Sequence, residues 1–289
     1  MSFVLIRRYA TQILFPILAT VAMVGCVTTG PMTPVTTRLD GGITSVSLTI
    51  PVTEGNYVKA EMFHPESAAP VPGVFVFPTY YVNQFNRPEH FDRVYAIELA
   101  KLGYATLVPN LNHHGIRAYN TKYGQDVLAI SQWFRARPEV MDDRIGAVGF
   151  SIGGYHASLL NRVDPATRAV VGYYGVYDNS TFIPWAADQA TSPVNHASQV
   201  NGAVLLLHGQ NDDETRVQMA TAYRQKLIDA GKTVDLVVYP GDVHRFDRGP
   251  SDVMKGAERS PAGHVYRLNP ASRDDAWRRT TEWLKKYMY

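Results

Sequence analysis

Apolar and polar residues along the chain follow two repeats, a period of two typical of strands and a period of about 3.6 typical of helices. Gly42–Val52 and Tyr57–Phe63 alternate in period two and predict a hairpin. Short apolar runs predict buried strands at Gly73–Phe77, Ala105–Val108, Ile145–Phe150, Ala169–Tyr174, Ala203–Leu207 and Val234–Tyr239. Amphipathic runs predict helices at Phe91–Leu102, Gln125–Arg135, Ile152–Val163, Thr215–Ala230 and Arg273–Tyr287.

Because strands alternate with helices, we expect an α/β fold with a mostly parallel sheet of about eight strands and helices on both faces. One domain over residues 42–289 can hold them, since α/β domains of about 250 residues are routine. Ligands of such sheets bind outside the carboxyl ends of the strands. The loops after residues 77, 108, 150, 174, 207 and 239 are therefore the places where chemistry is expected.

The first 25 residues have the layout of a secretory signal. Arg7 and Arg8 precede an uncharged apolar run, Ile13–Gly25, which is shorter than the ~20 apolar residues that cross a bilayer. Met23–Cys26 resembles the lipobox of bacterial lipoproteins, in which the cysteine becomes the lipidated first residue. An ordinary secretory signal with an incidental cysteine is the alternative.

This layout predicts the location of the mature protein. Residues 1–25 would be removed, and residues 26–41, rich in Thr and Pro, would tether the domain to a lipid on Cys26. We expect a bacterial cell-envelope protein that meets the membrane only through this anchor, or a secreted one if Cys26 is incidental. Val27 favours the periplasmic side of the outer membrane, by resemblance to bacterial sorting patterns.

Composition and charge exclude several classes of protein. An apolar share of 45% against 19% charged is typical of a globular chain. Without Arg7 and Arg8 of the signal, Lys+Arg and Asp+Glu are equal at 26. A neutral body without a Lys/Arg run gives no basis for nucleic-acid binding. Cys26 is the single cysteine, so disulfide scaffolds and thiolate metal clusters are excluded, and neither a metal nor an organic cofactor is implied.

Arg144–Gly154 predicts a nucleophilic serine on a strand-to-helix turn. Within it, Gly149, Ser151 and Gly153 form Gly-x-Ser-x-Gly, in which the small residues two places either side of the serine avoid steric clashes. Ser151 would project above the sheet at the positive end of a helix. The flanking strand and helix favour this interpretation over a glycine turn with an incidental serine.

A serine hydroxyl needs a base, and the base needs an acid. His244 directly follows the last predicted strand, and the other histidines fit this role less well. Asp212 and Asp213 follow the strand that ends at Leu207. We choose Asp212 because it lies three residues after Gly209, a spacing that resembles that of α/β-hydrolases. Either carboxylate could instead cap a helix. The order Ser, Asp, His is that of α/β-hydrolases.

An oxyanion requires backbone N–H donors. The amide of Ile152, next to the nucleophile, is one candidate. The loop after Phe77 should supply another, and because Pro78 has no N–H, Thr79 is our choice and Tyr80 the alternative. A substrate pocket is expected from Tyr80, Tyr81, His113, Tyr177, Trp185 and Phe246, with core packing the alternative for about half of them.

From about Gly73 to the C-terminus, the chain resembles the dienelactone hydrolase family of α/β-hydrolases. The resemblance is carried by Pro78–Asn83, Arg144–Gly154, Gly209–Asp212, Tyr239–Phe246 and Asp275–Arg279. It implies the α/β-hydrolase fold and a hydrolase, without a substrate. The founding enzymes use a cysteine where this chain has Ser151, and hold a glutamate near the oxyanion loop, where residues 78–86 contain no carboxylate.

We therefore predict a carboxylic-ester hydrolase that acts on a small-molecule ester through an acyl-enzyme on Ser151. A serine peptidase of the prolyl-oligopeptidase type is one alternative, although such enzymes usually carry a large extra domain. A non-catalytic envelope binding protein on a hydrolase scaffold is the other. The oligomeric state does not follow from the sequence.

Overall fold

The computed structural model describes residues 31–79, 91–111, 121–178, 191–248 and 263–289. Its strands are β1 (Val35–Leu39), β2 (Ile43–Pro51), β3 (Tyr57–Pro65), β4 (Val71–Phe77), β5 (Ala105–Pro109), β6 (Val140–Phe150), β7 (Thr167–Tyr173), β8 (Ala203–Gly209) and β9 (Val234–Tyr239). Its helices are α1 (Phe91–Lys101), α2 (Thr121–Arg135), α3 (Ile152–Val163), α5 (Val217–Asp229) and α6 (Pro270–Met288), with 3₁₀ turns η1 (Thr53–Gly55) and η6 (Pro193–Gln199).

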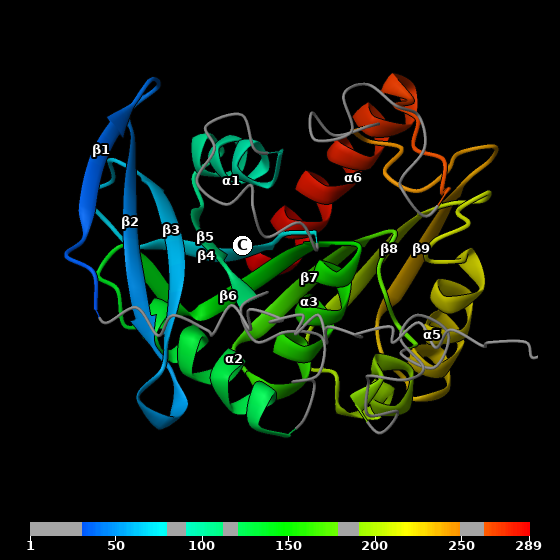
Figure 1. Ribbon diagram of the computed structural model, residues 1–289, viewed down its shortest axis with the longest axis horizontal. Helices are drawn as coiled ribbons and strands as arrows, with labels where there is room; N and C mark the ends of the chain where they lie inside the picture. Colours follow the sequence, from blue (N-terminus) through cyan, green and yellow to red (C-terminus); the bar gives the residue numbers. More distant parts are fainter. Residues whose placement is uncertain (1–30, 80–90, 112–120, 179–190, 249–262) are drawn as a thin grey trace, which may run out of the picture.

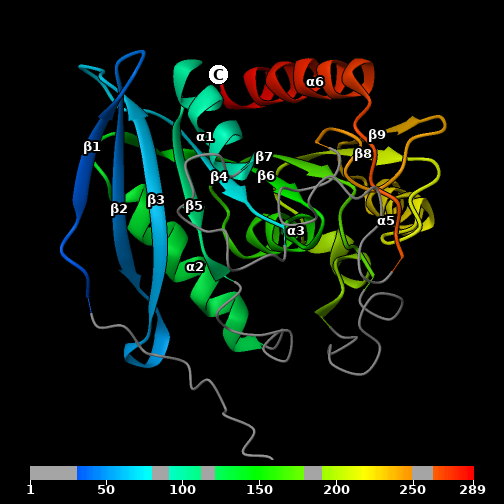
Figure 2. The ribbon, with the colours of Figure 1, turned by 45° about the horizontal axis from the view of Figure 1, so that its top comes forward.

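The nine strands form one sheet in the order β1-β2-β3-β5-β4-β6-β7-β8-β9. Strands β1 to β3 are antiparallel, and β3 pairs antiparallel with β5. From β5 to β9 every pairing is parallel. Helices α1 and α6 cover one face, and α2, α3 and α5 cover the other (Figures 1 and 2). The prediction of a mostly parallel sheet with helices on both faces is confirmed.

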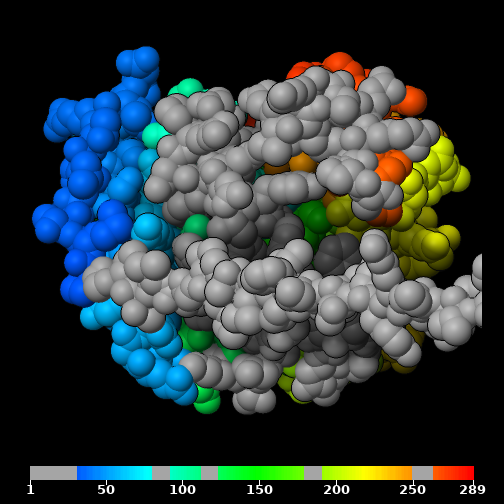
Figure 3. All heavy atoms as spheres, in the orientation of Figure 1, coloured from blue at the N-terminus to red at the C-terminus, as the bar shows by residue number. Residues whose placement is uncertain are grey.

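Strand β1 comes from the segment that we assigned to the tether. Val35–Leu39 pairs along its length with β2, from Val35 opposite Ser47 to Leu39 opposite Ile43. Its first four residues are exposed, so backbone hydrogen bonds rather than an apolar face hold it at the edge. The sheet therefore extends seven positions upstream of residue 42. Strands β1 to β3 lie at one end of the molecule and α5 at the other (Figure 3).

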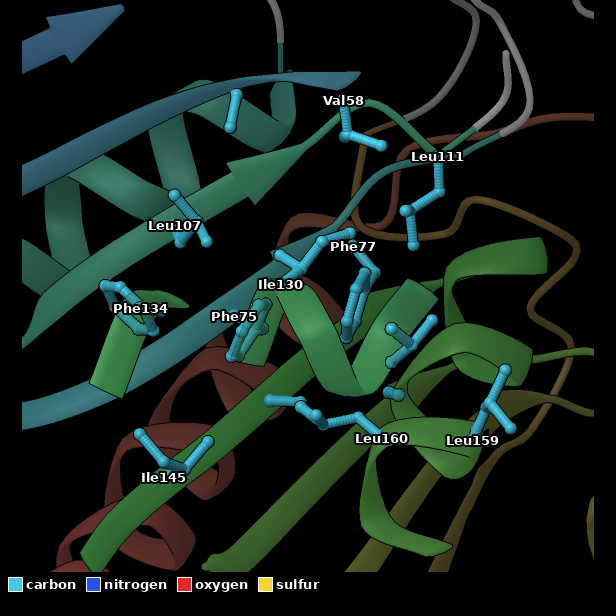
Figure 4. Close-up of a cluster of buried hydrophobic side chains, with 14 of the residues drawn as sticks. Val58, Phe75, Phe77, Leu107, Leu111, Ile130, Phe134, Ile145, Leu159 and Leu160 are labelled. Carbon is cyan, nitrogen blue, oxygen red and sulfur yellow. The ribbon is translucent and has the colours of Figure 1, made fainter. Parts of the chain in front are cut away.

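Alternation in the central strands divides the core between the two faces. Phe75 and Phe77 of β4 face the α2 and α3 side, where Phe75 meets Phe134 of α2 edge-on at 5.1 Å (Figure 4). Val74 and Val76 of the same strand face the α1 and α6 side. The strand is thus buried on both faces, as expected of a parallel sheet covered by helices, and it carries a nearly continuous apolar run.

Residues 1–30, with the predicted signal and Cys26, lie outside the described part of the chain. Among the residues that the structure does describe, none of the helices combines the length and apolar composition needed to cross a membrane.

Candidate active site

Ser151 lies on a sharp turn between β6 and α3. Its backbone has φ 55° and ψ −117°, a conformation that costs a non-glycine residue on the order of 1–3 kcal/mol. Backbone hydrogen bonds hold it there: the Ser151 N–H donates to the Tyr173 carbonyl at 3.0 Å, and the Ser151 carbonyl accepts from Val176 at 3.1 Å. Both partners lie on or just after the neighbouring strand β7. The sheet thus holds the serine in place at the start of α3.

The two glycines of the motif are required by close backbone approaches. A Cβ on Gly149 would lie 2.1 Å from the Gly153 carbonyl oxygen, and a Cβ on Gly153 would lie 2.2 Å from the Phe77 carbonyl oxygen. The first of these contacts closes the turn around Ser151. The second presses the first turn of α3 against the end of β4, where the predicted oxyanion loop begins.

Three side chains from three loops meet in a hydrogen-bonded line. The His244 Nε2 atom lies 3.2 Å from the Ser151 hydroxyl oxygen, and His244 Nδ1 lies 2.8 Å from Asp212 Oδ2. Ser151, Asp212 and His244 are 5%, 5% and 2% exposed. These are the three residues predicted from the sequence, and the structure brings them together with the spacing that proton transfer from serine to histidine requires.

Asp212 is fixed by its own loop. Its Oδ1 accepts hydrogen bonds from the backbone N–H groups of Glu214 at 3.0 Å and Thr215 at 2.8 Å. The Thr215 hydroxyl lies 3.0 Å from the other carboxylate oxygen and 3.1 Å from His244 Nδ1. The side chain of Asp213, by contrast, is 50% exposed and lies 3.3 Å from His264. The loop thus separates the two candidates, directing Asp212 inward and Asp213 outward.

The charges along this line of hydrogen bonds shift the pKa values of both Asp212 and His244. Burial would raise the pKa of Asp212, but the charge of His244 and hydrogen bonds from His208 and His244 hold it well below its usual range. Burial would lower the pKa of His244, but the charges of Asp212 and Glu214 outweigh burial and raise it above the ordinary value. Asp212 is therefore ionised throughout the neutral range, and His244 is a stronger base than a free imidazole.

The predicted oxyanion donors border the same turn. Ile152 opens α3 and is 2% exposed, so its N–H belongs to the first turn, where helices leave their amides without internal acceptors. Thr79 follows Pro78 in the loop after β4 and is 6% exposed. A Cβ on Gly153 would also meet the Pro78 carbonyl oxygen, at 2.9 Å, so this loop runs beside the nucleophile. Tyr80, the alternative donor, lies outside the described residues.

Of the predicted pocket residues, Tyr80, Tyr81, His113 and Trp185 also lie outside the described residues. Tyr177 is 1% exposed and stacks on Tyr223 of α5, with ring centroids 5.0 Å apart. Phe246 is fully buried and packs on Tyr239 at 4.8 Å. Both contacts are typical of core residues. Core packing was the alternative that the sequence left open for about half of the predicted pocket residues.

A buried charged network, which the sequence did not predict, lies behind His244. The Tyr174 ring meets the His244 ring edge-on at 4.6 Å, and the Tyr174 hydroxyl donates to Asp247 at 2.8 Å. Arg248 lies 3.4 Å from Asp247 and donates to Asp92 of α1 at 3.1 Å. Both carboxylates are fully buried, and the Arg248 side chain is 1% exposed. The loop that carries the histidine is thus tied to the start of α1.

Within the described residues, no group of three or more His, Cys, Asp or Glu side chains is arranged to hold a metal ion.

The sheet order, the serine turn and the aspartate and histidine loops together define an α/β-hydrolase. The chain belongs to the dienelactone hydrolase family, whose model matches residues 58–288. The match begins at β3, upstream of the Gly73 start expected from the sequence.

Relatives agree with this assignment, and a solved structure shares the fold. A protein of Methylorubrum extorquens named "putative carboxymethylenebutenolidase" is 28% identical, over 85% of this chain and 82% of its own. A Bradyrhizobium protein named "probable 2-oxo-3-(5-oxofuran-2-ylidene)propanoate lactonase" is 26% identical, over 82% of this chain and 92% of its own. The crystal structure of P91, a dienelactone hydrolase-like phosphotriesterase from metagenomic libraries, has a TM-score of 0.68 at 20% identity, covering 86% of this chain and all of that one.

Larger peptidases share the fold as well. The dipeptidyl peptidase 4 of Porphyromonas gingivalis has a TM-score of 0.67 at 17% identity, over 83% of this chain. This chain spans only 35% of that protein. At such identity the likeness shows the fold alone.

Proposed function

We propose that the protein is a serine carboxylic-ester hydrolase in which Ser151, His244 and Asp212 are the nucleophile, base and acid. The observation that supports this best is the line of hydrogen bonds from the Ser151 hydroxyl through both nitrogens of His244 to the buried Asp212. A serine hydroxyl is a weak nucleophile until a base within hydrogen-bond reach takes its proton. This line supplies the base and fixes its orientation.

The proposed reaction follows from the geometry. His244 Nε2 takes the Ser151 proton as the serine oxygen attacks the ester carbonyl, and Asp212 stabilises the imidazolium through Nδ1–H. The N–H groups of Ile152 and Thr79 would bind the oxyanion. His244 then gives its proton to the departing alcohol, leaving an acyl group on Ser151. Water then attacks the acyl carbonyl as His244 Nε2 takes its proton, and His244 returns that proton to the serine oxygen as the acyl–oxygen bond breaks and the acid leaves.

Labelling and a substrate panel test this proposal. A serine-reactive phosphonate should add to Ser151 of the purified protein, which peptide mass spectrometry would locate. Esters of graded chain length, simple lactones and matched peptides should then be compared by kcat/KM, with esters or lactones the fastest. Lactones belong in the panel because the Bradyrhizobium relative is named for one. Faster peptide cleavage would favour a peptidase, and absence of both labelling and turnover would favour a binding protein.

The pH dependence of kcat/KM should show an acid limb. Only neutral His244 can accept the serine proton, and because neighbouring carboxylates raise its pKa, protonation begins at a higher pH than for a free imidazole. Activity should therefore fall as pH drops, with the midpoint above the ordinary histidine value of 6.5. Initial rates with a neutral ester, taken from about pH 5 to about pH 9 at constant ionic strength, would measure this midpoint. A midpoint below the ordinary value would contradict the assignment.

We also propose that Cys26 is lipidated and holds the protein at the envelope. The support is the sequence alone: a short apolar run and a small residue before the cysteine. Cys26→Ser should move the protein from the membrane fraction to the soluble fraction, because serine lacks the thiol sulfur to which the lipid would be attached. Fractionation with fatty-acid labelling in the bacterial host would measure this. A serine variant that still partitions with membranes and still carries label would overturn the anchor.

A further inference from the structure

A second carboxylate stands beside the proposed base. Glu214 Oε2 lies 3.7 Å from His244 Nε2, the nitrogen that faces the Ser151 hydroxyl. The Glu214 side chain is 22% exposed, whereas that of Asp212, on the other side of the imidazole, is fully buried. Asp212 is thus enclosed, and Glu214 is the carboxylate open to whatever approaches Nε2.

Glu214 is held in this position by a buried tyrosine. The Tyr266 hydroxyl donates to Glu214 Oε2 at 2.6 Å, and Tyr266 is 1% exposed. The backbone of Tyr266 pairs with that of His244 in an isolated parallel bridge. The Arg245 guanidinium lies over the Tyr266 ring, 5.3 Å from its centroid. The carboxylate, the tyrosine and the histidine therefore form one packed unit.

The charged groups around His244 give its surroundings a net negative charge. The described groups that face the imidazole are Asp212 and Glu214 from the loop after β8, Arg245 beside it in the chain, Tyr174 from the end of β7, and Tyr266. Two carboxylates oppose one guanidinium, and His208 contacts Asp212 rather than the imidazole. When His244 is neutral, the surroundings of Nε2 therefore carry net negative charge. The negative group nearest to Nε2 is the Glu214 carboxylate.

We propose that Glu214 determines specificity, favouring esters with neutral or cationic leaving groups over those that carry a carboxylate. This inference rests on the proposed ester hydrolysis. The departing oxygen takes its proton from Nε2, so it must come within about 3 Å of that nitrogen. A carboxylate attached to the leaving group is then brought close to Glu214 and repelled. The same charge makes His244 more basic, which assists proton removal from Ser151 and retards proton delivery to the alcohol.

A matched pair of substrates and a matched pair of variants test the inference. The substrates are 4-acetoxybenzoate and 4-acetoxybenzamide, which differ in the charge of the leaving phenol. Glu214→Gln should raise the benzoate-to-benzamide ratio of kcat/KM by about tenfold, the scale of a partly solvated charge pair. Asp213→Asn removes the same charge from the next residue, which does not contact His244, and should leave the ratio unchanged.

The pH profile separates an electrostatic role from a structural one. Glu214→Gln should move the acid limb by about one pH unit toward acid, and Glu214→Asp, which keeps the charge, should restore most of the parental profile. If Glu214→Gln lowers kcat/KM equally for both esters and leaves the limb in place, Glu214 only supports Tyr266 and the inference is wrong. If the parental enzyme hydrolyses no ester, the proposed function has failed. NMR titration of the His244 ring would still test the charge effect, and an unchanged titration in Glu214→Gln would overturn it.

Discussion

Ser151→Ala should lower ester turnover by on the order of a millionfold, the cost of removing the nucleophile from a serine-protease triad. The substitution removes the oxygen that would form the acyl-enzyme and leaves the Ile152 and Thr79 amides in place. Steady-state kcat on the best ester of the panel, together with loss of phosphonate labelling, would measure it. The residual rate should be the part of catalysis that binding and the oxyanion donors supply on their own.

The fold should tolerate this change, because backbone atoms hold the turn. The Ser151 N–H donates to the Tyr173 carbonyl and the Ser151 carbonyl accepts from the Val176 N–H, and alanine keeps both backbone groups. Circular dichroism and the melting temperature should therefore match those of the parental protein. Ser151→Cys restores the residue of the founding family members and should retain measurable activity on activated esters. A Ser151→Ala preparation free of contaminating esterase that still turns over near the parental rate would overturn the mechanism.

Asp212→Asn should lower kcat by on the order of 10⁴-fold, as the equivalent change does in a serine protease. A neutral amide removes the charge that stabilises the imidazolium, and it can turn its NH₂ toward Nδ1, which favours the wrong tautomer. Asp213→Asn, with a half-exposed side chain that faces His264, should change kcat by less than about threefold. Steady-state kinetics on both variants, each shown to be folded, would test the ranking.

The reverse ranking would move the acid to Asp213. Equal small effects in both variants would instead remove the carboxylate from the mechanism. The structure explains why Asn at position 212 is a sharp probe: the backbone amides of Glu214 and Thr215 can still donate to the amide oxygen, so the loop keeps its shape.

Most of the sheet could be predicted from the sequence because its strands carry dense apolar runs. Strand β6 continues into a glycine-flanked serine, and a chemical constraint there reinforces the pattern. Strand β1 could not be predicted in this way. Its residues are largely exposed, so the information that places it lies in backbone pairing with β2 rather than in its own side chains.

Within the site, spacing predicted Asp212 but not its surroundings. A Cβ on Gly209 would lie 2.6 Å from the Asp242 carbonyl oxygen, so the loops after β8 and β9 touch at that glycine and the residues after it reach His244. The predicted helix start at Thr215 was two residues early, because the Thr215 N–H is bonded to Asp212 and α5 begins at Val217.

Glu214 gave no comparable signal. Its place beside His244 depends on Tyr266, 52 positions along the chain and outside any predicted element. No periodicity or local spacing links two such residues. Only the assembled fold shows that the chain, which lacks a glutamate in the oxyanion loop, sets a different carboxylate against its proposed base.

The buried Asp92, Arg248 and Asp247 network sets a limit on how the site can move. Moving Arg248 out of the interior would leave Asp92 and Asp247 buried without their shared cation, and breaking a buried ion pair in this way costs about 3–5 kcal/mol. The histidine loop, tied through Arg248 to the start of α1, therefore has a high free energy of local opening. Breathing motions that admit a substrate or release an acid should leave His244 in place and be carried by other segments, so the base is in position before the ester arrives.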